Sequence, residues 1–194
     1  MSAPEQVLLK VRSQPALIPS DWSADGRYLV YYRTDPKTQL DLWILPLFGE
    51  RTPIPFARTE FNESQGQFSP DSKWLAYVSD EGGTPHVYVQ SFPVPSAKWH
   101  ISTASGSQPR WSRDGKELFY VGLDRKLMAV PVKAGTTFEP GAPHALFDTE
   151  LPAAPYRPQY SVSPDGRRFL LAAPAGEASS SAIVVQNWTL ALKK

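Results

Sequence analysis

The 194-residue chain contains no cysteine, only three histidines and no long run of apolar residues. The lack of cysteine excludes disulfides, thiolate nucleophiles and cysteine-ligated zinc. No segment approaches the roughly 18 continuous apolar residues that a membrane-spanning helix needs, and no signal peptide is visible at the N-terminus. We therefore expect no membrane contact from this chain itself.

An excess of one charge is also missing, because 20 Lys and Arg residues nearly balance 19 Asp and Glu residues. Binding of nucleic acid requires a dense basic face, which this balance does not provide, so we expect no nucleic-acid partner. A hydrophobic content of 41%, with 12% aromatic residues, is enough for the packed core of a globular protein.

Long amphipathic helices are absent from the sequence pattern as well. Instead, 20 prolines and 12 glycines separate short runs rich in Tyr, Val, Leu, Phe and Trp, which is typical of β-strands. An internal repeat organises these runs, with the form apolar-Ser-x-Asp-Gly-basic-x-apolar. Its four copies cover residues 21–29, 67–75, 110–118 and 161–169, and Ser72 is the one departure at the glycine position.

The spacing and the chemistry of this repeat predict an all-β fold, a β-propeller of four-stranded antiparallel blades. The glycine position recurs at residues 26, 72, 115 and 166, at intervals of 46, 43 and 51, close to the roughly 40–50 residues of one blade. Ser, Asp and Gly favour tight turns, so each motif is predicted to be a hairpin turn, and its aspartate a turn residue rather than part of a carboxylate ring. The apolar strands that follow are continuous, as in sheets covered on both faces.

Four blades are expected in a single propeller domain over residues 1–194, at about 20–57, 66–102, 108–148 and 158–190. The fourth repeat lacks an outer strand, and an apolar strand over 6–11 precedes the first motif, so this N-terminal strand is predicted to complete the last blade. Three arrangements fit: a self-closed four-blade ring, half of an eight-blade homodimer formed by blade completion, or a piece of a longer propeller.

The Ser-x-Asp-Gly repeats resemble those of the TolB-like, WD-repeat-like propellers of bacteria. Segments 41–47, 65–71, 116–120 and 184–188 are similar to the C-terminal propeller region that follows the kinase domain in many bacterial eukaryote-like serine/threonine kinases. The resemblance implies a sensory or protein-interaction module in an extracytoplasmic or periplasmic location. Neither a His-Arg-Asp loop nor an Asp-Phe-Gly motif is present, so no kinase activity is expected of this chain.

Catalytic and metal-binding motifs are not found. A serine hydrolase needs a nucleophile elbow, and Ser107 after Gly106 is only a distant imitation of one. His86, His100 and His144 are far apart in the sequence, so neither a metal site nor a cofactor is predicted. The recurring aromatic residues are predicted to be core rather than a stacking platform: Trp22, Trp43, Trp74, Tyr77 and Trp111.

The sequence therefore predicts a binding module rather than an enzyme. In a propeller, the loops between blades and those joining the second and third strands share one face, where they are free to vary and to recognise a protein or peptide. The candidate binding residues in these loops are Arg33, Asp35, Arg58, Glu60, Asp80, Glu81, Arg125, Tyr156 and Arg157. The alternative is a propeller-type hydrolase or lyase acting on a peptide or glycan at the channel mouth, with Glu60 and Asp80 as its only candidate carboxylate pair.

Overall fold

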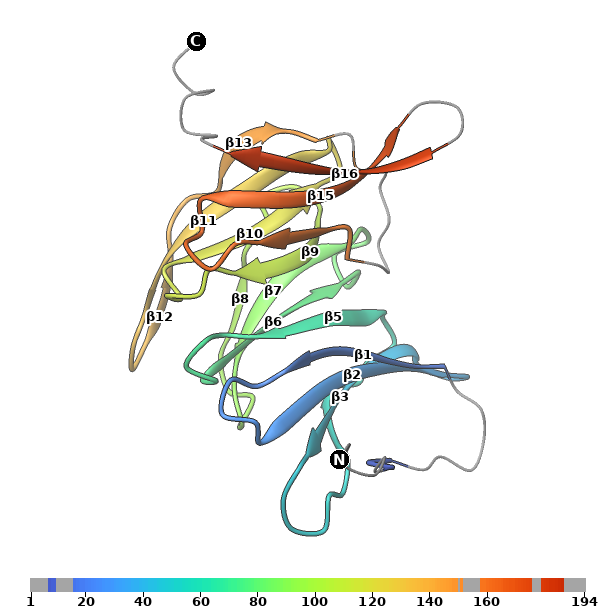
Figure 1. The fold of residues 1–194 in the computed structure, drawn as a ribbon. Helices are drawn as coiled ribbons and strands as arrows, with labels where there is room; N and C mark the ends of the chain where they lie inside the picture. Colours follow the sequence, from blue (N-terminus) through green and yellow to red (C-terminus); the bar gives the residue numbers. More distant parts are fainter. Residues whose placement is uncertain (1–6, 10–15, 150, 152–157, 176–178, 187–194) are drawn as a thin grey trace, which may run out of the picture.

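A computed structural model of the protein describes residues 7–9, 16–149, 151, 158–175 and 179–186. These residues form sixteen β-strands arranged in four antiparallel sheets (Figure 1). The predicted all-β fold of propeller-like blades is thus confirmed. The described part of the chain contains no helix that would be long and apolar enough to cross a membrane.

The first two sheets each contain four strands, paired in the order of the sequence. The first sheet consists of β1 (Leu17–Trp22), β2 (Tyr28–Asp35), β3 (Gln39–Pro46) and β4 (Ile54–Ala57). The second sheet consists of β5 (Glu63–Phe68), β6 (Trp74–Ser79), β7 (His86–Ser91) and β8 (Lys98–His100).

In the third sheet, the long strand β11 pairs with two short outer strands, β13 along its first half and β12 along its second. This sheet consists of β9 (Gly106–Trp111), β10 (Glu117–Gly122), β11 (Lys126–Ala134), β12 (Phe138–Pro140) and β13 (His144–Asp148). The fourth sheet has three described strands: β14 (Tyr160–Val162), β15 (Arg168–Ala175) and β16 (Ser179–Gln186).

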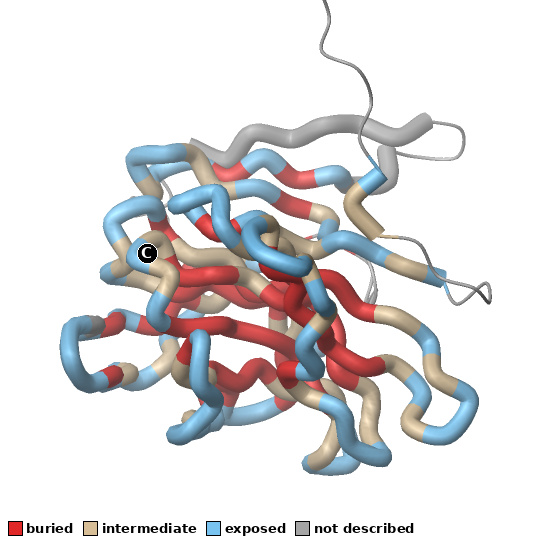
Figure 2. The backbone as a smooth tube through the Cα atoms, turned by 90° about the horizontal axis from the view of Figure 1, so that it is seen from below, coloured by how far each residue is buried: buried red, intermediate tan, exposed pale blue. Residues whose placement is uncertain are grey.

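Each sheet packs against the next one along the chain, so the four sheets form a stacked series (Figure 1). Alternate residues of a strand lie on opposite faces of its sheet. In β6, Leu75 and Tyr77 pack toward the first sheet. The residues between and beside them pack toward the third sheet: Trp74, Ala76 and Val78. This two-sided burial explains the continuous apolar strands of the sequence. Buried segments run through the middle of the series, and exposed segments lie at the turns (Figure 2).

The four motifs form the hairpin turns that the sequence predicts. In each of them, the motif serine donates a hydrogen bond to the motif aspartate, as Ser69 does to Asp71 at 2.6 Å and Ser112 to Asp114 at 2.8 Å. The same aspartate oxygen accepts a hydrogen bond from a backbone N–H two residues later, for example that of Lys116 at 3.1 Å. The motif aspartates therefore hold turns together and do not form a carboxylate ring.

Two sequence-based expectations need correction. Of the predicted N-terminal strand over 6–11, the structure describes only residues 7–9, which form no strand; residues 6, 10 and 11 lie outside the described part. Leu8 and Leu9 pack against the apolar cluster on the outer face of the first sheet. The last sheet lies at the opposite end of the series. Trp22 is not core either, because 55% of it is exposed at the end of β1.

Candidate functional site

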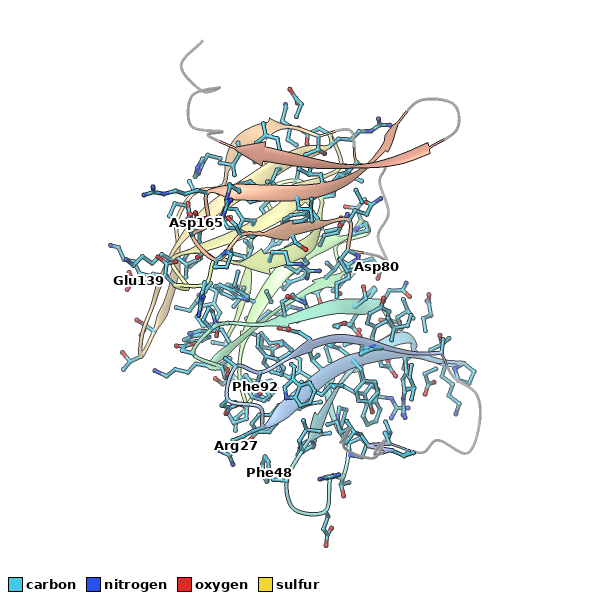
Figure 3. All side chains as sticks on the ribbon, viewed as in Figure 1. Arg27, Phe48, Asp80, Phe92, Glu139 and Asp165 are labelled. Carbon is cyan, nitrogen blue, oxygen red and sulfur yellow. The ribbon has the colours of Figure 1, made fainter. Side chains whose placement is uncertain are left out.

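One end of each of the first three sheets carries the connections β2–β3, β4–β5, β6–β7, β8–β9 and β10–β11, because successive antiparallel strands turn at alternate ends. We call this surface the loop face and the opposite one, which carries the four motif turns, the motif face. Asp80 of the loop face lies across the molecule from Arg27, Glu139 and Asp165 of the motif face (Figure 3).

Three of the predicted site residues meet on the first sheet. Asp35 ends β2, and its carboxylate accepts hydrogen bonds from the backbone N–H groups of Lys37 at 2.9 Å and Thr38 at 3.4 Å. The bond from Lys37 is the largest cause that lowers the pKa of Asp35. Arg58, which follows β4, reaches this carboxylate with Nη2 at 3.3 Å. The strand end and the loop after β4 are thereby tied together.

Arg58 also binds a buried carboxylate that the sequence analysis did not single out. Its Nε lies 3.4 Å from Oδ2 of Asp41, which is fully buried and accepts a further hydrogen bond from Thr38 Oγ1 at 2.9 Å. Burial raises the pKa of Asp41. Glu63 of the neighbouring sheet is also buried, and burial raises its pKa although Thr59 donates to it from both its hydroxyl and its backbone N–H.

Arg33, the third of these residues, packs on an aromatic ring. Its guanidinium carbon lies 3.8 Å from the ring centroid of Trp43, and that of Arg58 lies 6.0 Å from the same centroid. Trp43 is 9% exposed, so the two arginines cover an indole that would otherwise face solvent. The structure thus gives Arg33 a packing contact in addition to its place near the loop face.

Asn62 links three connections of the loop face, and the sequence analysis missed it. Its backbone N–H donates to Asp80 Oδ1 at 2.8 Å, and its side-chain amide donates to Asp80 Oδ2 at 2.7 Å and to Gln39 Oε1 at 3.1 Å. Because Gln39 begins β3 and Asp80 follows β6, this one side chain joins the first two sheets. No local sequence signal marks such a role, since its partners are 23 and 18 residues away.

Glu81 belongs to a separate group on the second sheet. Its carboxylate forms an ion pair with Lys98 of β8, and the Lys98 ammonium lies 4.3 Å from the ring centroid of Tyr88. Burial, together with the nearby Glu81, raises the pKa of Tyr88 to about 12. The ring of His100 stacks on Tyr88 and contacts His86, so histidines that are distant in the sequence are brought together here.

The remaining predicted residues are not drawn into these groups. Glu60 makes no hydrogen bond or ion pair with another described residue, and the carboxylate of its supposed catalytic partner Asp80 is engaged by Asn62. Arg125 lies exposed in the β10–β11 turn, and its carbonyl accepts a hydrogen bond from the backbone N–H of Thr149 at 2.8 Å. Tyr156 and Arg157 lie outside the described residues.

A cleft of 470 Å³ lies on the motif face, between the turns of the second and third sheets. Its lining includes Pro70, Asp71, Asp114 and Lys116, which belong to two neighbouring motif turns. Since these residues already have a structural role in their turns, the cleft is a weaker candidate for a binding site than the loop face.

The sheets, their sequential packing and the motif turns together define a β-propeller fold. No protein-family model matches the sequence, and no curated protein matches it. TolB from Acinetobacter baumannii matches in structure with a TM-score of 0.73 and 20% identity, over 93% of this chain and 43% of that chain. The fold of this chain is therefore that of a TolB-like propeller.

Two further solved structures are similar. A protein assigned as TolB from Agrobacterium tumefaciens has a TM-score of 0.70 and 20% identity, over 93% of this chain and 61% of that one. An auxiliary nutrient binding protein from Bacteroides thetaiotaomicron has a TM-score of 0.55 and 12% identity, over 80% of this chain and 42% of that one. The chain thus spans less than two thirds of the length of each of these proteins.

Proposed function

We propose that this chain is a non-catalytic propeller module that binds a protein or peptide partner on its loop face, around the first two sheets. The observation that carries the proposal is the linkage of three connections by Asn62, which holds Asp80 and Gln39 in fixed positions. Side chains that are ordered before binding lose less entropy when a partner arrives, so such a surface favours recognition.

The charges of this surface indicate the chemistry of the partner. The side chain of Arg58 is 45% exposed although it pairs with Asp35 and with buried Asp41, so its outer edge is open to a carboxylate. Asp35, Glu60 and Glu81 provide negative charge on the same face. A peptide that carries both acidic and basic side chains complements this mixture, and arginine is among the residues that contribute most to protein interfaces.

A role as the sensory part of a bacterial signalling kinase belongs to the same proposal. It is supported by the likeness of segments 41–47, 65–71, 116–120 and 184–188 to kinase-linked propellers, and it implies an extracytoplasmic partner. The similarity to an auxiliary nutrient binding protein, at 12% identity, supports the propeller fold alone.

A hydrolase or lyase is the second candidate, and one observation favours it. Asp41 and Glu63 are buried carboxyl groups whose pKa values are raised by burial, as in general acids, and Arg58 is beside Asp41. The test is whether the chain turns over a peptide or glycan. If Asp41→Asn loses this turnover but still binds peptide, the result favours the enzyme over the binding module.

Selection of a random peptide library on the intact chain tests the binding module. We expect enriched peptides whose affinity falls about tenfold or more in Arg58→Gln and in Glu60→Lys, because a charge-assisted contact is lost or reversed. Arg113→Gln, in an exposed motif turn, is the matched control and should bind as the wild type does. Enriched peptides that bind all three variants equally would overturn the proposal, as would a selection without enrichment.

A homodimer formed by blade completion is a further part of the proposal. It is supported by the series of four sheets, whose first and last members lie at opposite ends (Figure 1). Light scattering on a sizing column distinguishes the alternatives: twice the chain mass of 21.5 kDa supports the dimer, and a mass near 21.5 kDa contradicts it.

A further inference from the structure

The pairing of β7 with β8 brings two histidines into direct contact. His86 begins β7 and His100 ends β8, and Tyr88 and His100 are opposite each other in the register. His100 Nε2 lies 2.9 Å from His86 Nδ1, and the ring centroids are 4.5 Å apart. His100 is exposed and His86 half-buried, so solvent reaches the pair.

Both rings are held in place by neighbouring side chains. His86 Nε2 lies 3.2 Å from Thr84 Oγ1, and His86 Nδ1 lies 3.1 Å from Ser102 Oγ. A proton on Nε2, donated to Thr84, leaves the lone pair of Nδ1 directed at His100. The His100 ring stacks on Tyr88, with centroids 5.0 Å apart and planes 20° from parallel. The Thr84 contact, made by the ring nitrogen that does not face His100, is of the kind that orients the histidine ligands of metal sites, whereas the Ser102 hydroxyl gives up Nδ1 when a metal binds.

We propose that His86 Nδ1 and His100 Nε2 form a two-histidine site for a divalent transition metal ion, with copper(II) bound most tightly. Two nitrogens that are each about 2.0–2.1 Å from a metal ion and at a right angle to each other are about 2.9 Å apart. This is the separation found in the protein. Square-planar or tetragonal nitrogen coordination is typical of copper(II) and nickel(II), and copper(II) is the tightest-binding divalent ion of the first transition row.

The protonation state and the surrounding charges favour this site. Partial desolvation of its ring lowers the pKa of His100, which favours the neutral form that a metal ion binds. When the metal binds, the proton on His100 Nε2 moves through solvent to the other nitrogen of the same ring. The Lys98 ammonium is paired with Glu81, so the nearest positive charge is compensated. In the described part of the chain no third His, Cys, Asp or Glu completes the site, which leaves its other coordination positions open.

Copper(II) titration of the full chain tests the proposal by calorimetry and by electron paramagnetic resonance. We expect one copper ion per chain, with hyperfine structure from two nitrogens. His86→Gln and His100→Gln should each weaken copper binding by about 10–100-fold or more. The loss of a residue that only holds a histidine ligand in place already costs a metal site this much affinity. His144→Gln is the matched control, because His144 is an exposed histidine on β13 of another sheet, and it should bind as the wild type does.

The spectrum of the unmutated chain and the copper affinities of the variants test the site separately. A spectrum of the unmutated chain with one nitrogen or none overturns the proposal without any variant, and so does wild-type affinity in both His86→Gln and His100→Gln. Loss of binding in His144→Gln alone would place the copper elsewhere and equally overturn it. Circular dichroism of each variant shows whether the sheets are retained. The ligands of this site are His86 and His100, so it does not rest on Arg58 or Asn62 of the proposed peptide-binding surface.

Discussion

Gln108 of β9 and Gln159, which precedes β14, are hydrogen bonded to each other in both directions. Gln108 Nε2 donates to Gln159 Oε1 at 3.0 Å, and the backbone N–H of Gln159 donates to Gln108 Oε1 at 2.6 Å. On the other side, the backbone N–H of Gln108 donates to Gln65 Oε1 at 2.6 Å. Glutamines four residues before the motif serine thus join the second, third and fourth sheets through their innermost strands.

Truncation of the central glutamine should destabilise the protein. Gln108 is 1% exposed, so Gln108→Ala leaves the backbone N–H of Gln159 without its partner and removes a second hydrogen bond. We expect the free energy of unfolding to fall by about 2–4 kcal/mol, measured by urea denaturation. Arg167→Ala, an exposed turn substitution, should change it by less than about 0.5 kcal/mol. Equal effects of the two substitutions would show that the glutamine contacts contribute little.

The second motif turn carries a backbone strain that the third does not. Ser72 has a φ of 56° where Gly115 has 71°, and a left-handed conformation costs a residue with a Cβ about 1–2 kcal/mol. Ser72→Gly should therefore leave the free energy of unfolding unchanged or raise it by up to about 1 kcal/mol. The relief of backbone strain is offset in part because glycine has more conformational entropy than serine in the unfolded chain. Gly115→Ser should lower it by about 1 kcal/mol. Thermal unfolding of both variants gives the comparison, and a stabilising Gly115→Ser would contradict it.

Close packing between the first two sheets depends on Gly66 of β5. A Cβ at this position would lie 2.6 Å from Val30 Cγ2 and 3.2 Å from Leu42 Cδ1. Gly66→Ala should lower the free energy of unfolding by about 1–3 kcal/mol, since both contacting side chains are buried in the core. Gly135→Ala is the control, because nothing lies within 4 Å of a Cβ there. Equal denaturant midpoints for the two variants would argue against this close packing.

The motif turns should make stability depend on pH in the acid range. A hydrogen bond from the motif serine lowers the pKa of Asp25, Asp114 and Asp165. A lowered pKa in the folded state contributes stability above the ordinary carboxyl range, and this contribution is lost as pH falls through the folded-state pKa. In Ser112→Ala, we expect the loss in the free energy of unfolding to be larger at neutral pH than between about pH 2 and 4.

Urea denaturation across this pH range measures the effect. Part of the loss in Ser112→Ala should persist at all pH values, because Ser112 Oγ also accepts the backbone N–H of Glu117 at 2.9 Å. Ser161→Ala, on an exposed serine of β14, is the control and should show no such pH dependence. A loss that is constant with pH would mean that Asp114 titrates normally in the folded protein.

The candidate site was predicted only in part. Asp35 and Arg58 were expected on one face, and the structure joins them, because the turn and loop that carry them follow directly from the strand pattern. Asp41, Asn62 and the His86–His100 pair were not anticipated as partners. Their contacts bridge 17 residues for Asp41 with Arg58 and 14 residues for the histidines, so they depend on sheet register rather than on neighbours in the chain.

By itself, the sequence determined the hairpin turns, their spacing and the all-β character of the chain. These features arise from local chemistry, since the residues of each motif form the hydrogen bonds of the turn within five residues of each other. Only the tertiary structure decided that Leu8 and Leu9 lie on the first sheet, that glutamines join successive sheets and that two histidines touch. Those contacts come from how strands pair and how sheets pack, which depends on burial and register across the whole fold.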